Sequence, residues 1–196
     1  MEQILVPAPG TSHLTAEDSA LHLFQIAALL LGDEQAAVAL VEETVAGVET
    51  DPCAEATLAY AEARTLLVHT AVRQIAGRHP EEFSSPAAPL VDAACIETDD
   101  LAAAILAGEQ VGNLIAAAGR AGLRQWLEQL PPALRTVFVL RAIAGQDAEQ
   151  TAESLRQSGA PGAQEWRRDQ VGSVYRQALC SLASGLMQAS IALVPA

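Results

Sequence analysis

The arginines are the side chains of this sequence best suited to chemistry, because they supply all eleven of its basic residues and no lysine is present. A guanidinium can bind two phosphate oxygens in parallel, so arginines that share one surface suit a nucleic-acid backbone. On a helical wheel, however, Arg167, Arg168 and Arg176 point in three different directions and form no single stripe. The candidate contacts to a nucleic acid are Arg73, Arg78, Arg167, Arg168, Ser173 and Arg176.

Charge is distributed unequally along the 196 residues, whose formal net charge is -13. Residues 1–119 contain three arginines and eighteen acidic residues, whereas residues 120–196 contain eight arginines and six acidic residues. The acidity therefore belongs to the first part of the chain, and the second part is faintly basic. A polyanion would be attracted only to the second part.

Motifs of catalysis or metal binding are not apparent. The sequence contains neither a glycine-rich phosphate loop nor a nucleophile elbow. We find no histidine–carboxylate pair at metal-binding spacing. We therefore expect no enzyme activity, no cofactor and no metal. The histidines considered are His13, His22, His69 and His79.

Composition favours an all-α fold, because alanine and leucine dominate and no segment alternates like a strand. We expect an N-terminal tail at 1–13 and a three-helix domain at 14–78, with Thr15 and Asp33 as helix caps and Gly32 as a stop. The third helix is predicted over Glu55–Gly77. Its predicted apolar stripe is Leu58, Ala61, Thr65, Val68, Val72 and Ile75.

Residues 79–119 are predicted to be a linker, because prolines and serines interrupt the helical pattern, with one helix from about Asp100 to Ala118. A second domain is predicted over 120–192. Pro132 suits a first helical turn, and Asp147 with Gln150 forms a capping box. A turn rich in glycine and proline then leads to a last helix over Gln164–Ala189. The apolar stripe predicted for that helix is Val171, Val174, Ala178 and Leu182. A short helix, a turn and a long helix in this order are typical of a helix-turn-helix.

Two stretches resemble the extracytoplasmic-function sigma factors, a family of bacterial transcription initiation factors. LLLGDEQAAVALVEETVAGV (29–48) is similar to the family's region 2, in which an acidic helical segment docks on core RNA polymerase. LEQLPPALRTVFVLRAIAGQDAEQTAESL (127–155) is similar to region 4, the helix-turn-helix that reads promoters. The resemblance implies two small helical domains joined by a linker. It also assigns polymerase docking to Leu40, Val41, Glu42, Glu43 and Thr44.

The sequence departs from the family where promoter DNA should be bound. The third helix of the region 2-like part has no aromatic residue near its C-terminal end, and stacking platforms are what flipped bases require. In the last helix, Gly172 and Val174 occupy positions where the family often has cations. The turn before that helix is about nine residues longer than in the family, by comparison with its usual motif. A bulky turn there could block entry into the major groove, or could supply Arg167 and Arg168 as phosphate contacts.

These observations together predict a cytoplasmic, sigma-factor-like protein that binds core RNA polymerase and has weakened promoter recognition. One alternative is a sigma mimic that acts through protein contacts, for example by titrating an anti-sigma factor. Another is a helical interaction module that does not bind DNA. No segment reads as a signal peptide or as a membrane helix, so no membrane partner is expected.

Overall fold

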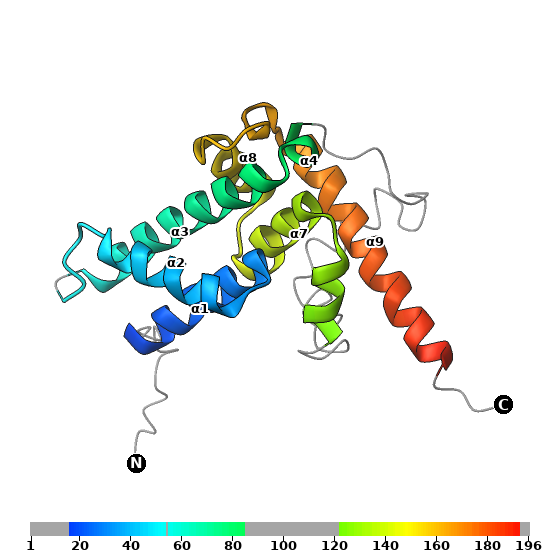
Figure 1. Ribbon diagram of the computed structural model, residues 1–196, viewed down its shortest axis with the longest axis horizontal. Coiled ribbons are helices and arrows are strands. Elements are labelled where there is room, and N and C mark those ends of the chain that lie inside the picture. The colour runs from blue at the N-terminus through cyan, green and yellow to red at the C-terminus, as the bar shows by residue number, and fades with distance from the viewer. Residues whose placement is uncertain (1–15, 54, 85–121, 193–196) are drawn as a thin grey trace, which may run out of the picture.

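The structure is a computed structural model that describes residues 16–53, 55–84 and 122–192, with side chains described as far as residue 184 (Figure 1). Every regular element in these ranges is a helix or helical turn, and they contain no strand. The predicted all-α class is confirmed. The predicted N-terminal tail, the cap at Thr15 and the helix expected over Asp100–Ala118 lie outside the described residues.

The first two helices form a hairpin around Gly32. α1 (Ala16–Leu31) and α2 (Glu34–Ala46) pack against each other. Gly32 has φ +71°, a left-handed conformation that glycine adopts without steric cost. Asp33 then caps α2, because its carboxylate accepts a hydrogen bond of 2.8 Å from the backbone N–H of Ala36. The predicted stop and cap are both confirmed.

Helix α3 (Ala56–Arg78) has nearly the predicted bounds, but its buried face differs from the predicted stripe. Val68, Val72 and Ile75 are buried as expected. The first half of the stripe is wrong, because Leu58, Ala61 and Thr65 are exposed. Small residues occupy the buried face there, at Ala59 and Ala63, and they allow the neighbouring helices to approach closely.

A short helix, α4 (Pro80–Ser84), follows α3 directly. It lies at the start of the segment predicted to be a linker, yet its Phe83 is fully buried. Residues 79–84 are therefore packed into the folded structure, and a linker could begin only after them.

The second part of the chain carries the expected helix-turn-helix elements. The start of α7 at Pro132 and the capping box of α8 are confirmed: the Asp147 carboxylate accepts from the Gln150 backbone at 2.8 Å, and the Gln150 side chain accepts from the Asp147 backbone at 2.9 Å. The elements are a helix at 122–129, α7 (Pro132–Phe138), the π-helical turn η2 (Val139–Ile143), α8 (Ala148–Gln157), the 3₁₀ turn η3 (Ala163–Glu165) and α9 (Arg168–Ala192).

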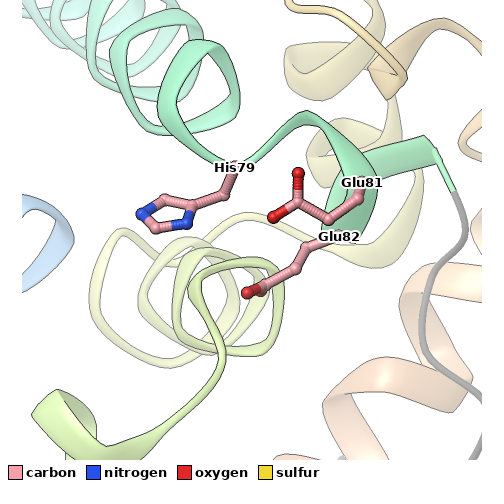
Figure 2. Close-up of side chains that lie close together, drawn as sticks. All are labelled: His79, Glu81 and Glu82. Carbon is pink, nitrogen blue, oxygen red and sulfur yellow. The ribbon is translucent and has the colours of Figure 1, made fainter.

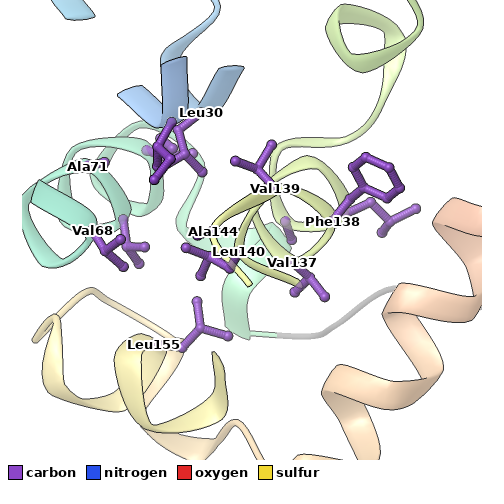
Figure 3. Packing of buried hydrophobic residues seen from close by; sticks show 14 of the residues in the cluster. Leu30, Val68, Ala71, Val137, Phe138, Val139, Leu140, Ala144 and Leu155 are labelled. Atoms are coloured by element: carbon purple, nitrogen blue, oxygen red, sulfur yellow. The ribbon is translucent and has the colours of Figure 1, made fainter. Parts of the chain in front are cut away.

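Buried side chains from both parts of the chain belong to one hydrophobic cluster (Figure 3). Leu30 comes from α1, Val68 from α3, Leu140 from η2 and Leu155 from α8, and each is completely buried. Helix α3 packs against α7 and α8, so the seam between the two parts is apolar. The division into two separate domains stays a prediction, whereas the described residues share a core.

Polar contacts cross the same seam as well. The Arg64 guanidinium donates to the carbonyl of Ala144 at 3.3 Å, and Arg124 pairs with Glu34 at 2.7 Å. The second pair is exposed and contributes little to stability. Among the described helices, none is both long enough and apolar enough to span a membrane.

Candidate functional site

The acidic segment of α2 is divided between the core and the surface. Leu40 is 2% exposed and Thr44 is 1% exposed, whereas Glu42 and Glu43 are exposed and Val41 is partly buried. A helix turns by about 100° per residue, so five consecutive residues cannot all face one partner. Of the five docking residues expected from the sequence, the two glutamates are those that a partner can reach directly.

Large apolar side chains are exposed on the same helix. Val38 is 46% exposed and Val45 is 53% exposed. Together with Glu42 they occupy positions i, i+4 and i+7, which lie on one side of a helix. We call Val38, Glu42 and Val45 the α2 face. The other large apolar residues of the described chain that are clearly exposed, Leu21 and Leu58, also belong to the first three helices.

The expected recognition helix, α9, buries one side and exposes the other. Its predicted apolar stripe is confirmed, and Tyr175 is buried beside it. Val174 is only 2% exposed, so a cation at this position could not reach DNA in this fold. The interpretation of Val174 as a lost cationic contact is therefore wrong, because the position belongs to the core. At Gly172, by contrast, an added Cβ atom would meet no atom of a neighbouring element within 4 Å.

Several arginines make contacts within the fold. Arg141 lies with its guanidinium carbon 5.1 Å from the centre of the Tyr175 ring, a cation–π contact, and donates to the carbonyl of Gln146 at 2.7 Å. Burial lowers the pKa of Arg135, whereas the negative charges of Glu82 and Glu128 act to raise it. The remaining arginines with structural contacts are Arg64, Arg124 and Arg156.

The candidate DNA contacts are placed on two different helices. Arg73 and Arg78 are exposed on α3, and Arg73 donates to the Thr70 hydroxyl at 3.4 Å. Ser173 and Arg176 are partly buried on α9, whose start carries the exposed Arg168 and is preceded by the exposed Arg167. The cations at this start are offset by acids, since residues 165–169 contain two arginines, one glutamate and one aspartate. The site is therefore only weakly suited to a polyanion.

The inserted turn, residues 158–167 between α8 and α9, packs inward. Trp166 is 1% exposed, and its indole N–H donates to the Phe83 carbonyl of α4 at 2.8 Å. Trp166 is therefore an anchor of the core. Trp126 is also anchored: it is partly buried, lies edge-on to Phe138 and donates to the Ser181 hydroxyl at 3.2 Å.

One histidine lies beside two carboxylates, which the sequence interpretation missed. Potential ligand atoms of His79, Glu81 and Glu82 lie within 4.8 Å of one another where α3 passes into α4 (Figure 2). The statement that no histidine–carboxylate pair has metal spacing is thus wrong. However, Glu82 already accepts a hydrogen bond of 3.3 Å from the backbone N–H of Ala133, so this carboxylate ties α4 to α7. We assign no metal to the cluster.

No family model matches the chain, and no curated protein or solved structure matches it either. The sigma-factor resemblance therefore rests on the motifs in the sequence alone.

Sequence reasoning missed Val38 on the α2 face and Phe83 as the buried partner of Trp166. Val38 could have been found from its spacing to Glu42 and Val45, which places all three on one side of a helix. Phe83 could not, because its role depends on contact with a turn more than 70 residues away.

Proposed function

We propose that the chain is a sigma-factor-like protein of bacterial transcription initiation, which docks on core RNA polymerase through α2 and recognises promoter DNA weakly. The observation that carries this proposal is the α2 face. Two half-exposed valines flank an exposed glutamate there, within the segment that resembles the family's polymerase-docking helix. Isolated apolar side chains on a surface are ordinary, but two on one helical side with a central charge suit a protein partner.

Weak promoter recognition follows from the start of α9. Acidic residues offset the arginines there, and Gly172 leaves a gap on the exposed side of the helix. Salt-dependent phosphate contacts need unpaired cations, so this surface has little to contribute when the protein is alone.

The docking proposal is tested by reversing one charge. In pull-downs with purified core RNA polymerase, E42K should weaken binding about tenfold, which corresponds to about 1.4 kcal/mol. The matched control is E17K, which reverses an equally exposed glutamate on α1. V45D should weaken binding as well without disturbing the core, because Val45 is half exposed. Equal binding by wild type, E42K and V45D would contradict docking through the α2 face.

The second candidate function is a sigma mimic that titrates an anti-sigma factor. The neutral start of α9 favours it, since such a role needs protein contacts and no promoter reading. An anti-sigma factor from the same genome that binds the chain, together with no measurable binding to polymerase, would select this function. Binding to neither protein would leave a helical interaction module.

A further inference from the structure

The inserted turn before α9 is fixed to α4 by a deeply buried side chain. The Trp166 ring lies with its centre 6.3 Å from that of Phe83, and both rings are almost completely buried. The indole N–H is satisfied by the Phe83 carbonyl at 2.8 Å, so the hydrogen bond joins the turn to the backbone of α4. Both the ring contact and the hydrogen bond have to break before α4 can leave the turn.

Backbones also approach closely at the same place. Gly162 has φ +78°, and a Cβ atom added there would lie 2.3 Å from the Ser84 hydroxyl oxygen and 2.5 Å from its backbone nitrogen. No side chain fits in this space, because contacts under 3.0 Å force something to move. Gly159, in the same turn, has φ +66° but no atom within 4 Å of its added Cβ.

The turn is tied to the rest of the helix-turn-helix through Arg156. Its guanidinium donates to the Trp166 carbonyl at 2.9 Å and also pairs with Glu149 and Glu153. α4 is held from its other side by the hydrogen bond from the Ala133 N–H to Glu82. The Phe83 and Trp166 rings also belong to the buried cluster that both parts of the chain share, so the release of α4 would take two large side chains out of that cluster.

The position of α4 matters because a recognition helix enters the major groove with its N-terminal end first. α9 begins at Arg168, two residues after Trp166, whose hydrogen bond to the Phe83 carbonyl brings α4 close to that end of the helix (Figure 1). α4 brings Glu81, which is exposed, and Glu82, which is partly buried. The Glu82 carboxylate faces the start of α7, where it accepts from the Ala133 N–H, so it is α4 itself that takes up space beside α9 that a duplex would need.

We propose that the inserted turn is a latch that holds the acidic α4 over the N-terminal end of α9, and that α4 must be released locally before α9 can meet DNA. The DNA part of this inference rests on the proposed function, whereas the latch itself does not. Release exposes Trp166 and takes the rings of Phe83 and Trp166 out of the shared core, while the buried side chains of α1, α3, α7 and α8 stay packed against one another.

The latch is tested in a W126F background, where Trp166 is the only tryptophan, by acrylamide quenching and by hydrogen exchange at residues 79–84. G162A should push the turn away from Ser84, so quenching and exchange should both increase while far-UV circular dichroism keeps the helical signal. G159A is the matched control, because it imposes a similar left-handed strain without the collision. Unchanged quenching in G162A, or loss of helicity beyond that of G159A, would overturn the latch.

A second variant avoids backbone strain altogether. W166F keeps a buried aromatic ring but removes the indole N–H that bonds the Phe83 carbonyl, together with part of the ring volume, so exchange at residues 79–84 should rise in otherwise wild-type protein. Exchange equal to that of wild type would contradict the role given to this bond.

DNA binding is then measured by fluorescence anisotropy with a random-sequence 30-base-pair duplex at one fixed, low salt concentration. G162A should bind the duplex about tenfold more tightly than G159A and wild type do. This is the gain expected if the state with α4 released is populated at about 10% in wild type and becomes the dominant state in G162A. If G162A shows greater exchange and quenching but no tighter DNA binding, α4 does not inhibit DNA binding and the inhibitory role is overturned. None of these measurements uses polymerase, so failure of polymerase docking would show separately, in the pull-downs.

Discussion

At the scale of single residues, Asp147 shows how one side chain defines an element. Its carboxylate accepts the Gln150 backbone N–H, and the Gln150 side chain accepts the Asp147 N–H in return. Two backbone donors that water would otherwise have to satisfy are thus paired at the start of α8. We predict that D147A lowers the free energy of unfolding by about 1 kcal/mol in urea titrations. D147N retains an acceptor and should stay close to wild type; an equal loss in both variants would contradict the capping role.

His69 should make stability depend on pH. Burial lowers its pKa from the usual 6.5, the charge of Arg73 lowers it further, and Glu153 acts in the opposite direction. The folded protein keeps the imidazole neutral, whereas the unfolded chain binds a proton near pH 6.5, so the unfolded state gains protons first as the pH falls. We predict that stability decreases below about pH 6.5 and that H69Q reduces this decrease. Urea midpoints at pH 7.5 and 5.5 measure it; the same decrease in wild type and H69Q would refute it.

Caps and turns were the residue-scale features that could be predicted, because their chemistry is local. Gly32, Asp33, Pro132 and Asp147 act within three or four residues of their own positions. Tyr175 could not be predicted as the platform for Arg141, since that contact depends on how α9 packs against η2.

At the scale of elements, α9 contains a helical glycine with no structural reason to be there. An added Cβ at Gly172 would meet nothing within 4 Å, and its φ is not left-handed. We predict that G172A raises the free energy of unfolding by about 0.5–1 kcal/mol, because alanine loses less backbone entropy in a helix. Thermal denaturation measures the gain. G145A is the control with the opposite expected result. Gly145 has φ +69°, so the same change there should lower the free energy of unfolding.

The open space at Gly172 also allows a cation to be added. If the exposed side of α9 lies along a duplex, G172R should tighten DNA binding and steepen the dependence of log K on log salt by about 1. Anisotropy titrations at several salt concentrations report this slope. G77R, which adds the same charge at an equally open glycine of α3, is the control. Identical slopes in the two variants would contradict a DNA-facing side of α9.

Helix positions were predictable from periodicity, but the buried side of a helix was predictable only where large apolar residues lie on it. In α9 that condition holds, and the predicted stripe is buried throughout. In the first half of α3 the buried side consists of alanines, while Leu58 is 57% exposed. A prediction that places the largest apolar side chains in the core therefore selected the wrong side of α3 in its first half. The π-helical turn η2 also escaped prediction, because one extra residue per turn leaves no mark on composition.

At the scale of the whole molecule, the apolar seam should make the two parts unfold together. Leu140 is completely buried in the cluster that joins them. We predict that L140A lowers the free energy of unfolding by about 2–5 kcal/mol and shifts the transitions seen by tryptophan fluorescence and far-UV circular dichroism equally. L58A should change little, since Leu58 is exposed. Two separated transitions would contradict a shared core and favour two independent domains.

The sequence allowed the order of the longer described helices to be predicted, but not the short helix α4, the π-helical turn η2 or the way in which the two parts of the chain meet. The proline- and serine-containing segment after residue 78 is typical of a linker, and such composition carries no information about docking. The seam depends on contacts such as that between Arg64 and Ala144, 80 residues apart. Likewise, two of the five predicted docking residues are buried, because every third or fourth position of α2 faces the core.

The close approach of Gly162 to Ser84 has an evolutionary consequence. A relative that keeps α4 in this place must keep glycine at position 162, whatever else changes in the turn, because even a methyl group collides with the Ser84 backbone. At position 159 the demand is weaker, since only a left-handed conformation is needed there and asparagine could replace glycine. When related sequences are aligned, the loss of glycine at 162 and of tryptophan at 166 should occur in the same lineages. Those lineages would have a turn that no longer holds α4.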